Sequence, residues 1–284
     1  MGTSVSDILA GTLRIMKDRF WSMLGIWAVF FAITIGVGIV FALLIGGAVG
    51  LGGLATENPF AMGAGMIVGL IVFYLGYIMV ICAQTAALNA MASPLQQPQF
   101  GEAFSAGWRS APTLLGIIVV LIIAYLLGAL VIGGILGALA LAGQAGTVID
   151  VILAILLIPA LVWLACRLYV LFPVVAVEKV YNPITAIGRC WSLTRGHALT
   201  VFLVMLILML GMVLAFGLLV LPVYSSFSAG AFAPSASSFG SAIFTFFGFI
   251  VLAILFALVS ATVISVMHGA FSGRTVEDFS ETFG

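Results

Sequence analysis

The sequence has very little charge. Asp, Glu, Lys and Arg together make up 6% of the 284 residues, whereas hydrophobic residues make up 64%. A soluble domain carries about 25% charged residues because water must solvate its surface. So few charges cannot cover a water-facing surface, which excludes a soluble domain and leaves lipid as the surrounding solvent. The nine Lys and Arg residues are also too sparse for a nucleic-acid-binding surface.

Cysteine and histidine, the residues typical of metal and redox sites, are scarce. Cys82, Cys166 and Cys190 are far apart and form no CxxC or Cys/His spacing. The two histidines, His197 and His268, have no cluster of acidic residues beside them. No Ser/His/Asp triad or phosphate-binding glycine loop is recognisable either. We therefore expect no metal, no cofactor and no enzymatic activity.

Long apolar tracts dominate what remains. A membrane span needs roughly 20 apolar residues to cross the hydrocarbon layer. It must be helical when no alternating β pattern is present, because lipid cannot satisfy backbone polar groups. The chain therefore reads as one all-α membrane domain over 1–284, a polytopic bundle of six transmembrane helices. The expected spans are 22–49, 61–90, 112–140, 147–176, 198–222 and 239–268.

Except for Arg167, which lies just inside the expected fourth span, the basic residues occur only in alternate breaks between the apolar tracts or beyond the first and last of them. These residues are Arg14, Lys17, Arg19, Arg109, Arg167, Lys179, Arg189, Arg195 and Arg274. The intervening breaks carry Glu57, Asp150 or no charge. Basic residues resist translocation, so they mark the cytoplasmic side of each span. The pattern predicts a multi-pass protein of the bacterial inner (plasma) membrane with both termini in the cytoplasm.

The segments that enter the first, third and fifth spans look alike. Each places apolar residues three and four apart on one helical face, with polar or basic residues opposite. We expect short interfacial helices near 4–19, 99–110 and 183–195, the last started by Asn182 and Pro183. Three repeats of interfacial helix and helical hairpin would result. The alternative is that any such protein re-enters the membrane through polar linkers.

Three points mark where the interfacial helices would bend into their spans. They are the run 17–19, Pro112 and Gly196. Other polar residues stand near the predicted ends of spans, where water can solvate them at little cost. Asn89 and His268 are therefore expected to be solvated.

The most distinctive stretch covers residues 167–196. It contains Arg167, Pro173, Glu178, Pro183 and the run Arg189-Cys190-Trp191-Ser192-Leu193-Thr194-Arg195-Gly196. This stretch resembles the bacterial membrane-domain superfamily that includes the membrane part of some glycerophosphoryl diester phosphodiesterases and six-span proteins of the YciC type. Those proteins tend to have Arg, then Pro, an acidic residue and an Arg-Ser-Trp-x-Leu-Thr-x-Gly signature. Here Cys190 stands in place of the usual serine.

The resemblance implies a six-helix membrane domain and no defined activity. In the phosphodiesterases, catalysis belongs to a separate soluble barrel with metal-binding acidic residues and histidines. Nothing in these 284 residues corresponds to that barrel, so the resemblance concerns the membrane part only.

Arg167 stands inside the expected fourth span, where an unpaired guanidinium costs a few kcal/mol. One hypothesis pairs Arg167 with Glu178, and Glu178 with Arg189, in a network on the cytoplasmic face. The alternative is that Arg167 reaches water or a lipid phosphate alone. Trp191 and Arg195 complete the candidate structural or lipid-headgroup residues.

Two functions fit this pattern, and a third reading, an intramembrane lipid-modifying enzyme, would require polar residues that converge at the headgroup level. The first is a non-catalytic module that binds membrane lipid, including anionic phospholipid, or a partner membrane protein, in envelope homeostasis. The second is a permease or channel for a small amphiphilic solute. A water-filled cavity lined by Tyr77, Gln84, Tyr125 and Arg167 would favour the permease, and a packed centre would favour the binding module.

Overall fold

A computed structural model describes residues 4–55, 59–96, 98–140, 144–228 and 236–273, and every regular element in them is a helix. This confirms the predicted all-α class. The helices are α1 (Val5–Ala55), α2 (Pro59–Met91), α3 (Phe100–Ala140), α4 (Gln144–Leu168), α5 (Leu171–Ala176), α6 (Pro183–Leu193), α7 (Ala198–Ser228) and α8 (Ala236–Ser272).

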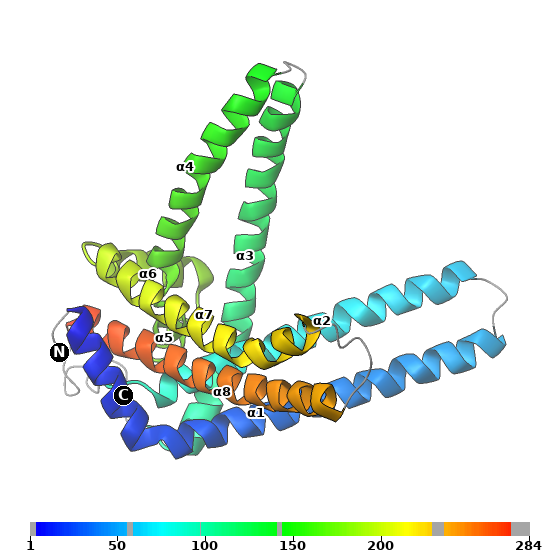
Figure 1. Ribbon diagram of the computed structural model, residues 1–284, viewed down its shortest axis with the longest axis horizontal. Coiled ribbons are helices and arrows are strands. Elements are labelled where there is room, and N and C mark those ends of the chain that lie inside the picture. The colour runs from blue at the N-terminus through cyan, green and yellow to red at the C-terminus, as the bar shows by residue number, and fades with distance from the viewer. Residues whose placement is uncertain (1–3, 56–58, 97, 141–143, 229–235, 274–284) are drawn as a thin grey trace.

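Six apolar stretches are long enough to cross a membrane, one each in α1, α2, α3, α7 and α8 and one that runs from α4 through α5, so this is a multi-pass membrane protein. They form three hairpins, α1–α2, α3–α4 and α7–α8, which diverge from one common end (Figure 1). The short helices α5 and α6 lie at that common end. The hairpins therefore meet at one end only.

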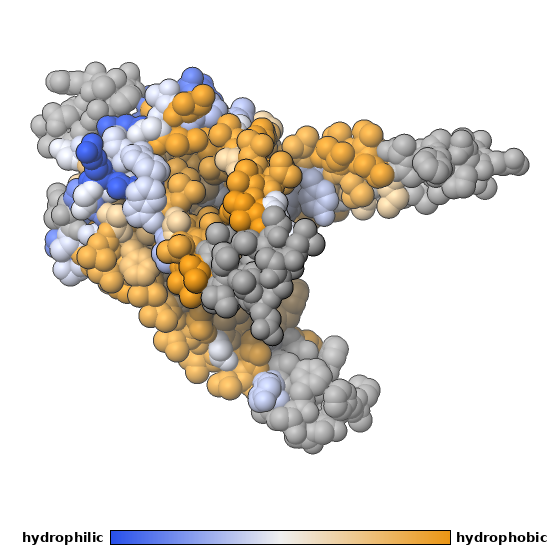
Figure 2. Space-filling view, turned by 90° about the horizontal axis from the view of Figure 1, so that it is seen from above, coloured by the Kyte–Doolittle hydropathy of each residue, from blue (hydrophilic) through white to orange (hydrophobic). Residues whose placement is uncertain are grey.

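The core of the molecule lies where the hairpins meet. Among the described side chains, every buried one falls within 8–30, 80–95, 103–117, 166–204 or 258–270. We call the end formed by these ranges the base and the rest of the hairpins the arms. Hydrophilic residues gather at the base, and apolar residues cover the arms (Figure 2). All described Lys and Arg side chains belong to the base.

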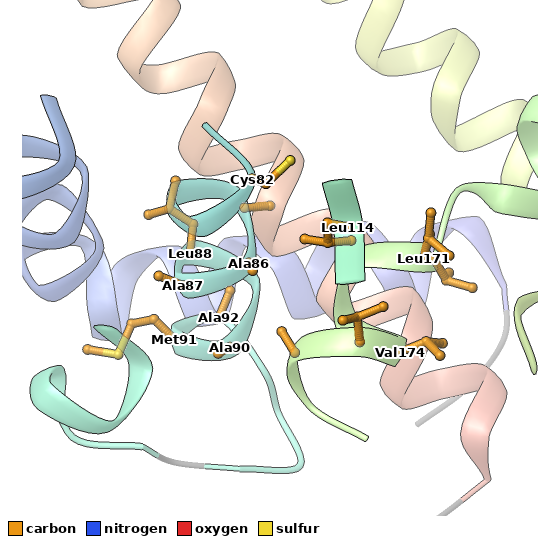
Figure 3. Packing of buried hydrophobic residues seen from close by; sticks show 14 of the residues in the cluster. Cys82, Ala86, Ala87, Leu88, Ala90, Met91, Ala92, Leu114, Leu171 and Val174 are labelled. Atoms are coloured by element: carbon orange, nitrogen blue, oxygen red, sulfur yellow. The ribbon is translucent and has the colours of Figure 1, made fainter. Parts of the chain in front are cut away.

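Small residues allow the helices of the base to approach closely. The last turns of α2 are rich in buried alanine and face Leu114 of α3 and Leu171 and Val174 of α5 (Figure 3). The tightest approach is at Gly107 of α3. A Cβ atom on this residue would lie 2.5 Å from the carbonyl oxygen of Ala83 and 2.7 Å from the Cβ of Ala87. In lipid, such close packing replaces the hydrophobic driving force that water would supply.

Two of the three expected interfacial helices are not separate elements. The segments 4–19 and 99–110 are the first parts of α1 and α3, which stay helical through 17–19 and through Pro112. The chain changes direction without a break in α1, whose first part runs at an angle to the rest (Figure 1). Neither Gly nor Pro interrupts 17–19, and the exposed Pro112 removes only one backbone donor.

The third interfacial helix is a separate element, α6. The side-chain oxygen of Asn182 accepts hydrogen bonds from the backbone N–H groups of Ile184 (3.0 Å) and Thr185 (3.3 Å), and Pro183 occupies the first turn. Gly196, with φ of +87°, separates α6 from α7. The predicted start signal and bend are confirmed here.

The expected span 147–176 is divided. α4 ends at Leu168, and α5 begins at Leu171 with Pro173 in its first turn. A proline in the first helical turn loses no intrahelical hydrogen bond, so it suits the start of a new helix better than the interior of a long one. Hydropathy is continuous across this stretch, so it predicts a single span there.

Replacing Gly107 should test the contact between α2 and α3. We expect Gly107→Ala to lower the free energy of unfolding by about 1–3 kcal/mol, because the new methyl group overpacks the interface. Gly101→Ala in the same helix is the matched control, since nothing lies within 4 Å of its Cβ position. Unfolding in detergent would be compared for both variants. Equal stability of the two variants would contradict the close approach.

Candidate functional site

The centre of the base is occupied by α5 and the residues that follow it. Leu171, Pro173, Val174, Val175 and Ala176 are all buried. The helix contacts α2 and α3 on the first two hairpins, α8 on the third, and α6. After α5 the chain carries Glu178, then turns at Lys179, which has φ of 56°. The last residues of this segment therefore place an acidic side chain in the middle of the base.

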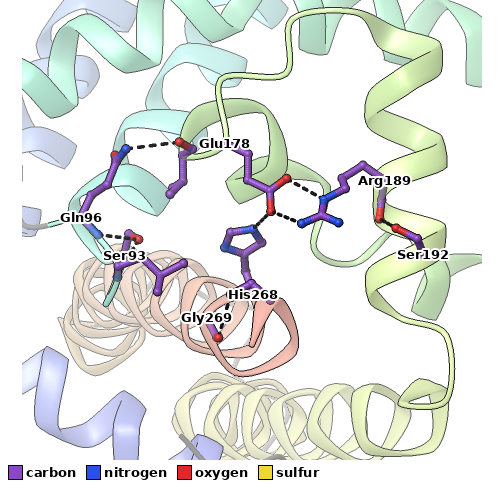
Figure 4. Close-up of polar contacts among 10 residues, drawn as sticks. Ser93, Gln96, Glu178, Arg189, Ser192, His268 and Gly269 are labelled. Carbon is purple, nitrogen blue, oxygen red and sulfur yellow. Dashed lines mark hydrogen bonds and ion pairs between the residues drawn. The ribbon is translucent and has the colours of Figure 1, made fainter. Parts of the chain in front are cut away.

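Glu178 joins three separate elements through its carboxylate (Figure 4). Nε of Arg189 donates to Oε2 at 2.8 Å, and Nη2 of Arg189 donates to Oε1 at 3.0 Å. Nε2 of His268, on α8, lies 3.1 Å from Oε1. A two-pronged Arg–carboxylate contact fixes direction as well as distance. The carboxylate thus connects the end of α5 to α6 and to α8.

These contacts are shielded from the surroundings. Glu178 is 2% exposed and His268 is fully buried, whereas the side chain of Arg189 is 32% exposed. Burial by itself would raise the pKa of Glu178. The hydrogen bonds and charges of His268 and Arg189 outweigh it and lower that pKa from 4.5 to about 2. The carboxylate is ionised, so Nε2 of His268 is the donor in their contact.

Neighbouring hydrogen bonds attach the first hairpin to the same base. The hydroxyl of Ser265 on α8 donates to the carbonyl oxygen of Asn89 on α2 at 2.8 Å. Nη1 of Arg19 on α1 donates to the carbonyl oxygen of Met91 at 2.9 Å. The amide of Gln96 donates to the carbonyl oxygen of Val177 at 3.3 Å. Each of these bonds joins segments that are distant in the sequence.

Arg167 does not take part in this network. Its guanidinium carbon lies 5.2 Å from the ring centroid of Trp163 and 5.3 Å from that of Trp191. The two tryptophan rings contact each other edge to face at 4.9 Å. The proposed pairing of Arg167 with Glu178 is not found, because Arg189 and His268 already occupy both carboxylate oxygens. Of the three residues in the hypothesis, the structure brings Glu178 and Arg189 together and leaves Arg167 outside.

The remaining candidate residues lie apart. Arg195 is exposed beyond the end of α6. Tyr77 stacks on Phe73 with ring centroids 6.0 Å apart, Gln84 is half-buried, and Tyr125 is 70% exposed. Within the described residues, no hydrogen bond or ring contact links Tyr77, Gln84 and Tyr125 with one another. These positions are spread along the hairpins.

His268 and Asn89 have roles in the base that the sequence pattern does not predict. Both were expected at solvated helix ends, yet each is 0% exposed and hydrogen-bonded in the base. The expectation was wrong because these helix ends pack against other helices of the base and are not in contact with water. The available signal was that Glu178, Arg189 and His268 all fall at the same predicted membrane face. That signal does not specify which side chains touch.

Within the described residues, no group of three or more His, Cys, Asp or Glu side chains is arranged to hold a metal ion. Comparisons with protein-family models, curated proteins and solved structures find no match to this chain. The geometry of the base and arms therefore carries the functional argument.

Glu178→Gln should weaken the base. We expect the free energy of unfolding near neutral pH to fall by about 2–3 kcal/mol, less than for a fully buried ion pair because Arg189 keeps access to the surroundings. His268→Asn is a second probe of the same carboxylate, and Thr185→Ala, at an exposed position on α6, is the control. Equal unfolding free energies for Glu178→Gln and the control would contradict a structural role for this contact.

The same pair predicts a pH dependence with a defined sign. The folded-state pKa of Glu178 lies below its ordinary value, so the stabilisation is fully present above about pH 4.5 and is lost as the pH falls toward about 2. The difference in unfolding free energy between the parent and Glu178→Gln should therefore shrink over that window. A difference that stayed constant would mean that the carboxylate does not carry the effect.

Proposed function

We propose that this protein is a non-catalytic module of the bacterial inner membrane that binds membrane phospholipid, with a preference for anionic headgroups, in support of envelope homeostasis. The observation that carries the proposal is the architecture itself. Three apolar hairpins diverge from one packed, basic base (Figures 1 and 2). This arrangement offers acyl chains the surfaces of the arms and offers headgroups the cations of the base.

The exposure of the arms supports lipid contact along their length. No described side chain in 118–137, 155–165 or 205–221 is buried. Leu43, Leu130 and Leu218 are 70%, 74% and 69% exposed, so these helices contact little protein beyond their own hairpin partner. In the bilayer, lipid chains fill the space around and between such arms.

The packed centre supports a binding role over a permease. α5 and Glu178 fill the region where the three hairpins converge, and their side chains are buried. The burial also argues against catalysis at this cluster, because a substrate has no direct access to the carboxylate of Glu178 or to the ring of His268. The charged groups there act as structural connectors in this proposal.

The distribution of charge supports the proposed orientation. Arg14, Lys17, Arg109 and Arg195 are exposed at or beside the base, whereas the described side chains of the arms include no Lys or Arg. The positive-inside rule assigns such a face to the cytoplasm. There it meets the negative surface of the inner leaflet, and each nearby basic residue contributes about 1 kcal/mol to the attraction.

Lipid retention tests the proposed function. The protein would be reconstituted in nanodiscs that contain a defined mixture of phosphatidylglycerol and phosphatidylethanolamine, released, and analysed by native mass spectrometry. We expect phosphatidylglycerol to be enriched over the bulk mixture by about fivefold for each basic residue engaged. Retained lipid that mirrors the bulk composition would contradict the proposal. A stoichiometric copurified protein in place of lipid would favour partner binding instead.

Cysteine labelling tests the orientation. The native cysteines are buried, so they give little background. Gly101→Cys introduces a thiol at an exposed position beside the base with nothing within 4 Å of its Cβ. We expect an impermeant maleimide to label this thiol in inverted vesicles and not in intact spheroplasts. The opposite pattern would place the base outside and overturn the proposed orientation.

A further inference from the structure

Arg167 is a cation without an acidic partner at the edge of the base. Its guanidinium lies against the rings of Trp163 and Trp191, at 5.2 and 5.3 Å. Its Nε and Nη1 atoms are buried, and no acceptor in the described part of the chain contacts them. The side chain as a whole is only partly buried, so Nη2 is the nitrogen left open to the surroundings.

The protein itself does not neutralise this charge. The nearest candidate along the sequence, Glu178, already binds Arg189 and His268 through both oxygens. Arg167 belongs to the apolar stretch Ile155–Ala176, which is long enough to span a membrane. A guanidinium at such a position is costly unless it meets an anion or water, and arginines within spans commonly mark functional sites. Ring contacts stabilise the cation but supply no acceptor for its N–H groups.

The surroundings of Arg167 match a lipid headgroup. Arginine presents a planar fork of donors that fits two oxygens of a phosphate. Trp163 and Trp191 are 46% and 38% exposed, and tryptophan is typical of the headgroup level of a bilayer. Leu161 and Leu164 on α4 are also exposed, at 51% and 38%. They continue the same helix into the arm, where an acyl chain can lie.

We propose that Arg167, Trp163 and Trp191 form a binding site for the phosphate of an anionic phospholipid. The phosphate engages Nη2 first, and a shift of the partly exposed Trp191 ring uncovers Nε for a second hydrogen bond. The acyl chains follow α4. The apolar surface next to the site favours a lipid phosphate over free inorganic phosphate. This inference rests on the proposed function and names the residues through which it acts.

The test compares the binding of two lipids to four proteins. Brominated phosphatidylglycerol or brominated phosphatidylcholine would be titrated into micelles that contain the parent, Arg167→Ala, Arg167→Lys or Arg109→Ala. Binding would be measured by the quenching of tryptophan fluorescence. Arg109 is the matched control because it is an exposed arginine of the base without a ring or acidic contact in the described residues. Native mass spectrometry would give the number of lipids bound.

We expect the parent to bind one phosphatidylglycerol in preference to phosphatidylcholine. Arg109→Ala should weaken that binding by at most about fivefold, as for loss of one nearby surface charge. Arg167→Ala should weaken it at least about tenfold more than Arg109→Ala does, because it also removes a charge-assisted hydrogen bond. Arg167→Lys keeps the charge without the planar fork and should fall between them. If Arg167→Ala does not fold, Arg167→Lys tests the site by itself. Binding of phosphatidylglycerol by Arg167→Lys that equals that of the parent would overturn the site.

The outcomes separate this inference from the proposed function. If the parent prefers phosphatidylglycerol but Arg167→Ala binds it as Arg109→Ala does, the site is wrong and the proposed function stands. If the parent shows no preference for phosphatidylglycerol at all, both are wrong. Excess inorganic phosphate should leave the bound lipid in place. Displacement of the lipid by phosphate would identify a free-anion site and overturn the lipid assignment.

Discussion

The buried carboxylate of Glu178 is the contact on which the arrangement of the hairpins depends. Glu178 follows α5, just after the second hairpin. Its carboxylate binds Arg189 on α6, just before the third hairpin, and His268 near the end of α8 in that hairpin. One ionised group therefore holds together segments that diverge on either side of it. A partly buried ion pair with these hydrogen bonds specifies a geometry more than it adds stability, and removal of one partner leaves the other uncompensated.

The low burial of the arms explains why this contact has such weight. Helices in lipid gain no hydrophobic free energy from association, so small-residue packing and interhelical hydrogen bonds must connect them. Both kinds of contact are concentrated in the base, at Gly107 against α2 and at Ser265 against Asn89. The arms remain available to lipid, and the proposed function and the Arg167 site both follow from that division between a fixed base and exposed arms.

Local signals in the sequence predict most of the elements but not the site. Six apolar tracts predict the six long helices, and Asn182-Pro183 predicts the start of α6, because these are local properties. The break before α5 was missed because Pro173 can begin a helix as well as bend one. The burial of His268 and the separation of Arg167 from Glu178 depend on contacts between segments far apart in the chain, which periodicity does not encode.

Hydrogen exchange in nanodiscs tests most directly whether Glu178 fixes the centre of the base. Backbone amide exchange of 170–178 would be compared between the parent and Glu178→Gln, with 107–117 of α3 as an internal reference. The account predicts slow exchange of 170–178 in the parent, markedly faster exchange there in Glu178→Gln, and little change in the reference segment. Equal protection of 170–178 in both proteins would contradict the central role of the carboxylate.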